Sequence, residues 1–556
     1  MEPKSPSKSK LPVPGSVQNC QSWKIGMTLL VLLVIVGIYL IFRSSRVDNV
    51  LNGSYFTVVL DCGSTGTRVN VYEWRNVGAV SNQNLPILLH LYPDNSTKGV
   101  CEYHCMQTEP GLDNFVGNES GVRASLEPLF IWAEQRVPLE RHGDTPVFVL
   151  GTAGLRRSPV DDGRRILKDV ERVVMEHRFL CRRSWIRVLS GKEEAYYGWV
   201  ALNYEMGLFG NSLRLPTLGL LDLGGSSLQV VAALNESTDD EHVFKSRIGS
   251  VEHQIVAYSF PAFGLNEAFD RTVIMLSHTQ ELRESAGGRF ELNHPCLDSG
   301  LVQNYTCQGC FGKNKDDEVN AILLVGDPNW EKCKGLARAA ATNLSSSYWS
   351  PLTNDSNCMG LSFYNGQLNT WNFYPLWRKN ELKLTAFSHS VARFHALSGF
   401  FAVYSMLNLS QRANLTKIWD EGQQFCARSW AGLPSNFTNQ KYAGQYCFRV
   451  PYLAAIIEDA LCLGDKEIIF GPGDVSWTLG AALLEGESVR LGSAKAHAGI
   501  LAPGNNWVLW SLLLFVLLLP LLLIVYHSQM KLPMPGMKVA IGECLPSCLC
   551  PRRQPA

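Results

Sequence analysis

Apolar residues recur along this chain with the two spacings that distinguish strands from helices. Short apolar runs bounded by Gly, Ser, Asp or Pro predict strands, and apolar residues at helical spacing predict amphipathic helices. The predicted strands are 55–60, 68–74, 146–150, 185–189, 218–223, 228–234 and 468–470, and the predicted helices are 126–134, 164–179, 192–204, 397–407, 450–461 and one that begins at 477. The segment 296–380 is rich in Asn, Gly and Cys and predicts loops. Because strands and helices alternate, we expect an α/β protein.

Two longer runs are apolar throughout. Gly26–Phe42 has 17 residues without a charge, and Trp507–Tyr526 has 20. A helix that spans a bilayer needs about 20 apolar residues, so the second run predicts a transmembrane helix outright and the first is of marginal length. The alternative for the first run is a cleaved signal peptide, but its leader is long and no clear small-residue cleavage site follows it. We therefore expect two membrane anchors that contact lipid.

The charges that flank these runs predict the orientation of the chain. Basic residues gather on the outer side of each run, at Lys4, Lys8, Lys10, Lys24, Lys531, Lys538, Arg552 and Arg553. Lys and Arg concentrate on the cytosolic side of a membrane. We therefore expect a multi-pass protein with cytosolic tails, whose region between the runs is luminal or extracellular, in the Golgi and endomembranes or at the plasma membrane.

Sequons and cysteines agree with that orientation. Ten N-x-[ST] sequons all lie between the runs, at Asn52, Asn95, Asn118, Asn235, Asn304, Asn343, Asn354, Asn408, Asn414 and Asn436. Twelve of the 16 cysteines lie there too, eight of them in 296–462. An oxidising compartment favours disulfides. A zinc site at Cys307 and Cys310 is the alternative, but no second CxxC pair lies nearby, so we expect disulfides and a glycosylated region.

The overall charge excludes one class of partner. Lys and Arg total 50, Asp and Glu total 50, and the formal net charge is zero. Proteins that bind nucleic acid usually carry a basic excess. We therefore expect no nucleic-acid partner.

Two short stretches repeat one another. Val59–Arg68 is VLDCGSTGTR, and Leu221–Val230 is LDLGGSSLQV. In each, an apolar strand ends in Asp and is followed by a turn of Gly with Ser or Thr. Glycines let the backbone approach phosphate oxygens, and successive N–H groups in such a turn bind anions. The Asp at the end of the strand can face a hydrated cation. The repeat therefore predicts two loops that hold one phosphate chain from both sides.

Two further motifs carry groups suited to phosphate chemistry. Gly151–Arg157 is GTAGLRR, whose Thr152 hydroxyl and following amides could hold another phosphate oxygen. An ordinary strand-to-helix turn is the alternative. Ser190–Trp199 is SGKEEAYYGW, in which a Glu can supply the base that hydrolysis of a phosphoanhydride needs. A solvated Glu pair is the alternative there.

Together, these motifs resemble the conserved regions of the apyrase family, the nucleoside triphosphate diphosphohydrolases. The five regions occur in order at Asp61–Arg68, Gly151–Arg156, Ser190–Tyr204, Leu221–Gln229 and Trp477–Ala481. The resemblance implies an α/β fold of two RNase H-like lobes of the actin/sugar-kinase superfamily, flanked by two transmembrane helices. The expected parts are tail 1–25, helix 26–42, lobe I in 50–190 with 471–500, lobe II in 191–470 with Cys-rich insertions, helix 507–526 and tail 527–556.

The resemblance also implies roles for individual residues. Glu194, Gln229 and Ser227 would be catalytic, with Glu194 as general base and Gln229 orienting the attacking water. Asp61 and Asp222 would hold Ca²⁺ or Mg²⁺ through its water shell. The remaining phosphate contacts would come from Gly63, Ser64, Thr65, Gly66, Thr152, Gly224, Gly225 and, again, Ser227. Trp477 would serve packing.

Several positions depart from the family pattern. Gly66 stands where several animal surface members carry His, which suggests room near the terminal phosphate and productive binding of both triphosphates and diphosphates. Leu228 replaces a usual Thr. Cys62 replaces a usual Ala, which suggests sensitivity to thiol reagents. Phe400 and Phe401 lie in SGFFAVY, which resembles the helix that stacks on the nucleobase in the family; apolar core is the alternative.

The expected activity is metal-assisted hydrolysis of nucleoside tri- and diphosphates to the monophosphate and phosphate by a membrane-anchored apyrase. One alternative is a Golgi nucleoside diphosphatase that clears GDP or UDP. Another is a non-catalytic actin-like ectodomain that binds nucleotides; the intact acidic set of Asp61, Glu194 and Asp222 disfavours it. The sequence selects neither a nucleobase nor an oligomeric state.

Overall fold

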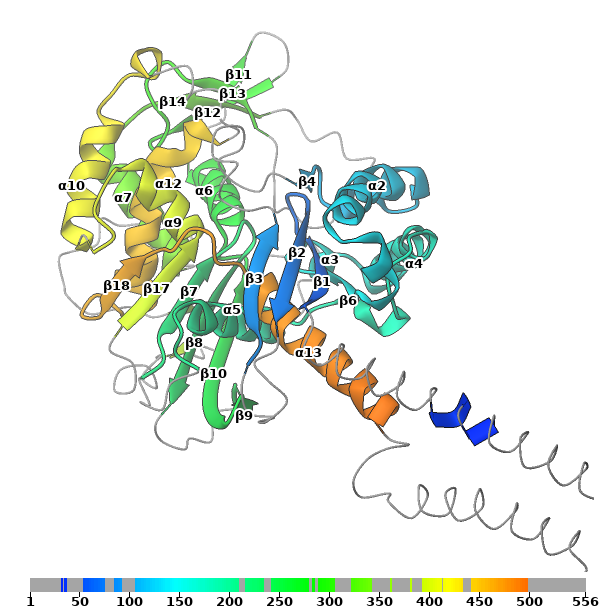
Figure 1. Cartoon of the computed structure of the whole chain (residues 1–556). Coiled ribbons are helices and arrows are strands. Elements are labelled where there is room, and N and C mark those ends of the chain that lie inside the picture. The colour runs from blue at the N-terminus through cyan, green and yellow to red at the C-terminus, as the bar shows by residue number, and fades with distance from the viewer. Residues whose placement is uncertain are drawn as a thin grey trace, which may run out of the picture. The chain divides into compact units, whose positions relative to one another are not determined.

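The computed structural model describes most of the region between the two apolar runs (Figure 1). The described residues are 32–33, 35–37, 54–75, 85–92, 106–209, 216–234, 242–279, 283–285, 289–305, 322–342, 361–362, 381–382, 393–412, 414–433 and 442–498. Val50–Ser493 form one compact unit, and Met1–Asn49 with Ala494–Ala556 form the other. Within the described ranges, no helix is both long and apolar enough to cross a membrane. The predicted span 507–526, and all of 26–42 except 32–33 and 35–37, lie outside them.

The first large sheet is built on the strand that precedes the first Gly-rich loop. Its order is β3 (Ile87–Tyr92), β2 (Thr67–Arg75), β1 (Ser54–Cys62), β5 (Val147–Gly151) and β6 (Ile186–Val188), with β4 (Gln107–Thr108) paired to β2. Strands β1, β2 and β3 are antiparallel, whereas β5 and β6 run parallel to β1. The sheet is therefore mixed, and the loop after β1 leaves from its interior.

The second large sheet repeats this topology. Its order is β9 (Val243–Ile248), β10 (Val251–Pro261), β8 (Ser227–Leu234), β7 (Gly219–Leu223), β17 (Arg393–Ser398) and β18 (Glu467–Phe470). Strands β7, β8 and β10 are antiparallel, and β17 and β18 run parallel to β7. Strand β7 therefore corresponds to β1 and β8 to β2. The α/β prediction is confirmed, and the two sheets share the topology that two related lobes require.

Helices cover both faces of both sheets, which explains why the inner strands are apolar on both sides. One core joins the first sheet to α2 (Glu119–Arg136) and α4 (Val160–Glu176). A second core, between the sheets, contains α5 (Gly191–Glu205) and the start of α13 (Trp477–Ala498). A third joins the second sheet to α6 (Leu265–Thr279), α7 (Trp330–Thr342), α9 (Gly399–Met406) and α12 (Tyr446–Ala455). Val58, Val59 and Leu60 of β1 are completely buried.

Shorter elements complete the described part. They are α3 (Ala153–Arg157), α10 (Leu415–Cys426), the strands β11 (Arg283–Ser285), β12 (Arg289–His294), β13 (Val302–Asn304), β14 (Ile322–Gly326), β15 (Leu361–Ser362) and β16 (Glu381–Leu382), and the single turns η2 (Leu112–Phe115), η3 (Leu139–Asp144), η4 (Arg183–Trp185), η6 (Trp430–Gly432), η7 (Ala443–Gln445) and η8 (Ile456–Ala460). The prediction of loops over 296–380 is wrong in part, because α7, β13 and β14 lie there.

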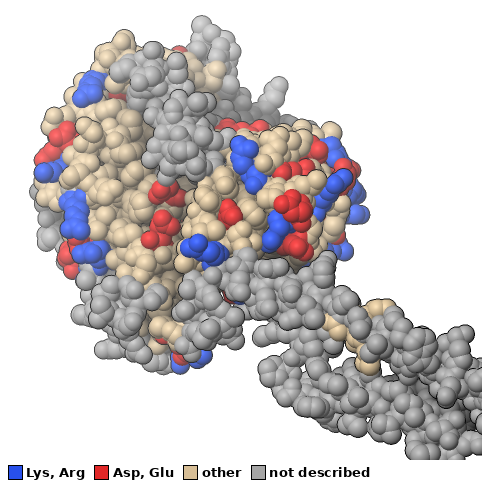
Figure 2. All heavy atoms as spheres, viewed as in Figure 1, with Lys and Arg blue, Asp and Glu red and all other residues tan. Residues whose placement is uncertain are grey.

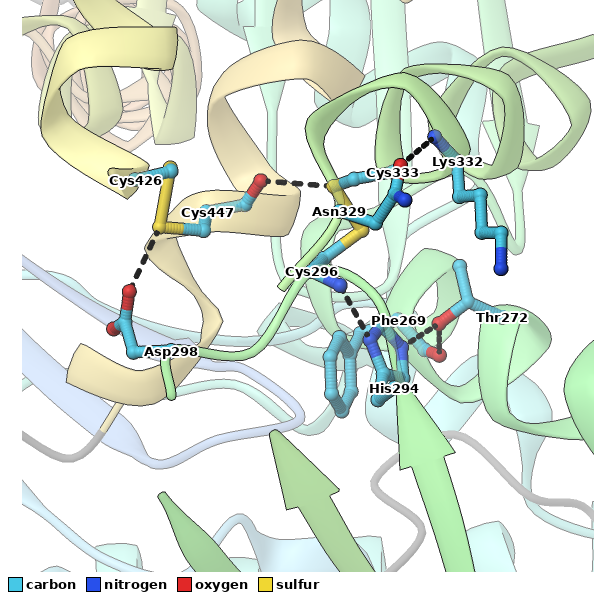
Figure 3. The surroundings of a disulfide bond; sticks show 10 residues. All are labelled: Phe269, Thr272, His294, Cys296, Asp298, Asn329, Lys332, Cys333, Cys426 and Cys447. Atoms are coloured by element: carbon cyan, nitrogen blue, oxygen red, sulfur yellow. Dashed lines mark hydrogen bonds between the residues drawn. A yellow bond between two sulfur atoms is a disulfide. The ribbon is translucent and has the colours of Figure 1, made fainter. Parts of the chain in front are cut away.

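Disulfides join the helices of the third core (Figure 3). Cys296 pairs with Cys333 of α7, and Cys426 of α10 pairs with Cys447 of α12. Cys462 is also disulfide-bonded. The prediction of disulfides in 296–462 is confirmed. The pair Cys307 and Cys310 lies outside the described residues.

The face drawn in Figure 2 carries basic and acidic side chains interspersed. On α2 and α4 they form ion pairs between the two helices. Arg123 pairs with Glu176, and Arg172 pairs with Glu119. These pairs are exposed and contribute little to stability individually.

Candidate functional site

The two Gly-rich loops have the same backbone geometry. Asp61 pairs with Arg68 in the register of β1 and β2, and Asp222 pairs with Gln229 in the register of β7 and β8. The turn is closed in the first loop by Gly63 N–H donating to the Gly66 carbonyl (3.0 Å). In the second, Gly224 N–H donates to the Ser227 carbonyl (2.9 Å). The sequence repeat is therefore a structural repeat.

The loops meet each other at their tips. The hydroxyl of Ser226 donates to the hydroxyl of Ser64 across 3.1 Å. A Cβ atom placed on Gly225 would lie 3.5 Å from Cγ2 of Thr65. Ser64 and Thr65 belong to the first loop, and Gly225 and Ser226 to the second. The structure thus brings the two predicted phosphate-binding loops together into one site.

Two glycines outside the loops permit this close approach. A Cβ on Gly154, in α3, would lie 2.9 Å from the Cα of Ser64. A Cβ on Gly264, just before α6, would lie 2.2 Å from the amide nitrogen of Ser226. Thr152 is buried at the start of α3, and its N–H donates to the Cys62 carbonyl (3.1 Å). The GTAGLRR segment therefore packs against the back of the first loop.

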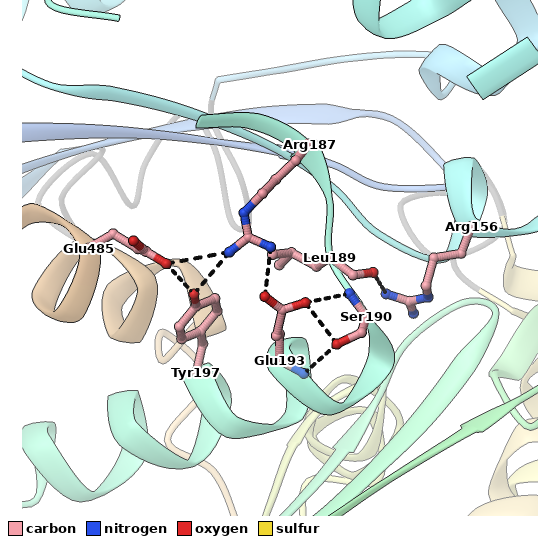
Figure 4. Close-up of polar contacts among 7 residues, drawn as sticks. All are labelled: Arg156, Arg187, Leu189, Ser190, Glu193, Tyr197 and Glu485. Atoms are coloured by element: carbon pink, nitrogen blue, oxygen red, sulfur yellow. Dashed lines mark hydrogen bonds and ion pairs between the residues drawn. The ribbon is translucent and has the colours of Figure 1, made fainter. Parts of the chain in front are cut away.

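The two acids of the SGKEEAYYGW motif have different surroundings. Glu193 forms a capping box with Ser190 at the start of α5 and binds Nη1 of Arg187 at 2.6 Å. Arg187 also contacts the hydroxyl of Tyr197 (3.3 Å) and Oε1 of Glu485 on α13 (3.4 Å) (Figure 4). Ion pairing and the cap lower the pKa of Glu193 despite its partial burial. Glu193 therefore stabilises the first turn of α5.

Glu194, the next residue, is oriented differently. Its Oε2 lies 2.7 Å from Nη1 of Arg156, and the side chain is 11% exposed. That Arg156 nitrogen directs a hydrogen bond to the Leu189 carbonyl (3.2 Å), and Glu194 Oε2 accepts no hydrogen bond from the described residues. The carboxylate is therefore held in place by the charge of Arg156, and its buried Oε2 has no hydrogen-bond donor among the described residues.

Asp61 and Asp222 lie at the ends of the two corresponding strands. Burial raises the pKa of Asp61 to about 6, against the opposing charge of Arg68, and Glu194 raises it further. Burial likewise raises the pKa of Asp222 to about 6; a hydrogen bond from Ser398 opposes this rise, and the charges of Glu194 and Asp61 add to it. The three carboxylates therefore repel one another.

This carboxylate group fits a hydrated divalent cation. Asp61 Oδ1 is buried and has no hydrogen-bond partner among the described residues, while its Oδ2 binds Arg68 at 3.3 Å. Carboxylate oxygens are the ligands that Ca²⁺ and Mg²⁺ prefer, and Mg²⁺ commonly keeps much of its water shell. In the part of the chain that the structure describes, no three His, Cys, Asp or Glu side chains converge closely enough for direct ligation. The carboxylates therefore fit a cation that they contact through its bound water molecules.

Three further residues of the sequence motifs lie in β8 and at the start of α13, outside the two loops. Gln229 is buried, and its amide donates to the hydroxyls of Ser227 (2.7 Å) and Ser259 (3.2 Å). Trp477 is buried in the core between the sheets, so the prediction that it serves packing is confirmed. Leu228 is completely buried in the core of the second sheet.

The structure corrects two expectations about departures from the family pattern. A Cβ on Gly66 would lie 2.5 Å from the Thr108 carbonyl oxygen, so β4 occupies the direction in which a side chain at this position would leave the backbone. Cys62 is free but only 1% exposed, and burial raises its thiol pKa well above the usual range. Reagents in water therefore do not reach this thiol in the folded chain.

The two aromatic residues that could stack on the nucleobase differ in how deeply they are buried. Phe400 is completely buried in the third core, so it is a core residue and has no free face for a base. Phe401 is half-buried and lies against the backbone of the Gly471–Gly473 loop, where a Cβ on Gly473 would meet its ring at 2.2 Å. Phe401 remains the candidate.

Several residues at the site were not singled out from the sequence. Ser226 contacts Ser64, Arg156 pairs with Glu194, and Ser398 binds Asp222. All three lie inside quoted motifs, because Ser398 opens the SGFFAVY run. The position of Ser398 beside Asp222 depends on the parallel pairing of β17 with β7, which no local pattern shows.

Comparisons with known proteins place these features in context. The model of the GDA1/CD39 (nucleoside phosphatase) family matches residues 49–366. The chain is 38% identical over 471 residues to the protein named probable apyrase 7 of Arabidopsis thaliana, covering 82% of this chain and 59% of that one. It is 30% identical over 309 residues to the guanosine-diphosphatase of Schizosaccharomyces pombe, covering 53% and 51%.

A solved structure shows the same fold. A crystal structure of nucleoside triphosphate hydrolases from Neospora caninum superposes with a TM-score of 0.51 at 15% identity. The match covers 83% of this chain and 98% of that one.

Proposed function

Because the chain belongs to the GDA1/CD39 (nucleoside phosphatase) family, we propose that it releases phosphate from nucleoside tri- and diphosphates down to the monophosphate. The contact between Ser64 and Ser226 carries this proposal most directly, since it joins two anion-binding loops into one site. A phosphate chain between the loops meets backbone amides and hydroxyls from both sides.

Glu194 is the general base in this proposal. Its carboxylate projects from the first turn of α5, which Glu193 and Ser190 cap. It accepts the proton of a water that attacks the terminal phosphorus in line, and the bond to the leaving phosphate oxygen breaks. Gln229 and Ser227, which hydrogen-bond each other, lie at the start of β8 directly after the second loop, and in this proposal they orient that water.

Developing negative charge on the phosphate oxygens is stabilised by loop amides and hydroxyls, which are fixed before substrate binds. Asp61 and Asp222 would hold Ca²⁺ or Mg²⁺ through its water shell. When bound, such a cation supplies charge neutralisation to the phosphate chain. The buried, unpartnered Oδ1 of Asp61 supports this assignment.

One assay tests the proposed function. Phosphate release is measured from ATP, ADP, GTP, GDP, UTP and UDP, with Ca²⁺ or Mg²⁺ and with EDTA. We expect turnover of tri- and diphosphates that EDTA abolishes. Turnover of GDP and UDP alone would favour the alternative of a nucleoside diphosphatase, which the relative named guanosine-diphosphatase suggests. Nucleotide binding without any turnover would favour the non-catalytic alternative.

We also propose that the active region is luminal or extracellular and held by the apolar runs 26–42 and 507–526. Four sequon asparagines fall among the described residues, Asn118, Asn304, Asn408 and Asn414, and all are exposed. The disulfides Cys296–Cys333 and Cys426–Cys447 fit an oxidising compartment. Glycosidase treatment of the full chain from membranes should lower its apparent mass, and extraction with carbonate should leave it in the membrane fraction.

A further inference from the structure

Arg449 of α12 is a buried cation that forms no ion pair with the described residues. The residue is 6% exposed, and its Nη2 donates to Oδ1 of Asn266 (3.0 Å) and Oε1 of Gln445 (2.9 Å). Its guanidinium lies 4.3 Å from the ring centre of Tyr442. These partners are neutral, and Nε has no hydrogen-bond partner. No carboxylate of the described residues forms an ion pair with Arg449.

Other arginines of the described residues have a carboxylate or main-chain carbonyls as partners. Arg68 and Arg156 form ion pairs with Asp61 and Glu194. Arg271, buried in α6, donates to main-chain carbonyls on two sides. Burial lowers the pKa of Arg449 to about 10, so it remains protonated at neutral pH. A buried charge without an opposite charge beside it costs stability, and Arg449 forms no ion pair with the described residues, so we look for a role of Arg449 in binding.

The position of Arg449 suggests that role. Asn266, its hydrogen-bond partner, donates its main-chain N–H to the Gly225 carbonyl at 2.9 Å. A Cβ on Gly225 would lie 3.0 Å from Nδ2 of Asn266. Only one side chain therefore separates the guanidinium of Arg449 from the second Gly-rich loop.

We propose that Arg449 is a substrate-binding residue whose guanidinium donates to a phosphoryl oxygen of the nucleotide from the side of the second loop. The inference rests on the proposed function, because it takes the loop to hold a polyphosphate. Guanidinium groups bind phosphate oxygens with strong charge-assisted hydrogen bonds. The substrate supplies the negative charge that the described residues do not place beside Arg449.

The test compares Arg449→Met and Arg449→Lys with the unaltered full chain. Steady-state phosphate release is measured with ATP, ADP, GDP and UDP, and inorganic pyrophosphate is used as a competitive inhibitor. Loss of a hydrogen bond to a charged group weakens binding by about tenfold to a hundredfold. We therefore expect Arg449→Met to raise KM for every nucleotide, and the inhibition constant of pyrophosphate, by about that factor, while kcat changes little. Arg449→Lys should recover part of the loss.

Two controls separate this role from others. Arg338→Met removes an arginine of α7 that pairs with Asp459, and KM should stay unchanged. The melting temperature of nucleotide-free Arg449→Met should change little, because the loss of an uncompensated buried charge offsets the loss of its hydrogen bonds to Asn266 and Gln445; a large fall would indicate a structural role instead and overturn the proposal. An effect confined to GDP and UDP would overturn it in favour of a contact with base carbonyls.

The outcomes also separate this inference from the proposed function. If the unaltered chain turns over nucleotides and Arg449→Met has the same KM, the inference alone is wrong. If the unaltered chain turns over none of the nucleotides, the proposed function fails first, and the inference with it.

Discussion

The hydroxyl of Ser226 lies 3.1 Å from the hydroxyl of Ser64 and donates a hydrogen bond to it. Ser64 lies in the loop between β1 and β2 of the first sheet, and Ser226 lies in the loop between β7 and β8 of the second sheet. The two residues are 162 positions apart in the sequence. Each lies at the tip of a loop that follows a completely or nearly buried strand. The contact makes the two loops a single structure, so a change that displaces one loop also affects what the other can bind.

Replacing Gly264 with Ala should displace the second loop. The new Cβ would lie 2.2 Å from the Ser226 nitrogen and 2.3 Å from the Gly225 carbonyl carbon, both backbone atoms. Overpacking of this kind costs about 1–3 kcal/mol, and we expect kcat/KM for ADP to fall at least about tenfold. Gly143→Ala is the matched control, because nothing lies within 4 Å of its Cβ. Equal activity of the two variants would contradict the loop geometry.

A Gly66→His substitution should mainly lower the stability of the fold and should have a smaller effect on the ratio of triphosphate to diphosphate turnover. A Cβ at this position would lie 2.5 Å from the Thr108 carbonyl oxygen, so β4 must move. We expect a lower free energy of unfolding by about 1–3 kcal/mol, measured by urea denaturation. A variant as stable as the unaltered chain, with a changed ratio of triphosphate to diphosphate turnover, would show that the space beside Gly66 is open after all.

Cys62 should resist thiol reagents in the folded chain. It is 1% exposed, and burial raises its pKa, so little thiolate forms and little reagent reaches it. Cys181 is half-exposed with a pKa raised to about 11, mainly by burial. Peptide mass mapping after treatment with a maleimide should show Cys181 modified ahead of Cys62, and Cys62 modified only in denaturant. Rapid loss of activity together with labelling of Cys62 would refute this.

His294 should make the fold sensitive to acid. Its Nδ1 accepts from the Cys296 N–H (3.1 Å), its Nε2 lies 2.9 Å from the Thr272 hydroxyl, and burial lowers its pKa to about 3. Between the unfolded pKa of about 6.5 and this value, the unfolded chain binds more protons, so stability falls as pH falls. From pH 7 to 5 the loss is about 2 kcal/mol.

Denaturation of His294→Gln at both pH values measures this contribution. The variant should lose less stability on acidification than the unaltered chain, although it is less stable at pH 7. His90→Gln is the control, because His90 is exposed. Parallel pH dependence in His294→Gln and the unaltered chain would rule out the assigned role of His294.

The strands that carry the loops could be predicted from the sequence, because β1 and β7 are apolar runs that end in Asp and Gly. Helix α5 was equally clear, since Ser190 and Glu193 form the capping box that its sequence encodes. The choice of Glu194 over Glu193 agrees with the surroundings found for the two acids, because Glu193 is engaged in the capping box and with Arg187.

Helix α6 could not be predicted in the same way. Asn266, Glu267 and Asp270 are buried within its first turns and interrupt the apolar stripe. Their burial depends on partners that are remote in sequence, such as Arg157 for Glu267 and Arg449 for Asn266. The contact between Ser64 and Ser226 is missing from the sequence pattern for the same reason: a local pattern does not contain the packing of two sheets.

The central claim is that Glu194 is the base of a hydrolytic site formed by both loops, and one comparison tests it most directly. Glu194→Gln and Glu193→Gln differ by a single position on the same turn of α5. Phosphate release from ATP and ADP is measured with both purified variants, after their melting temperatures confirm that they fold. We expect Glu194→Gln to lose about 10²–10⁴-fold in kcat, whereas Glu193→Gln keeps most of its turnover. Near-normal turnover by folded Glu194→Gln would contradict the account.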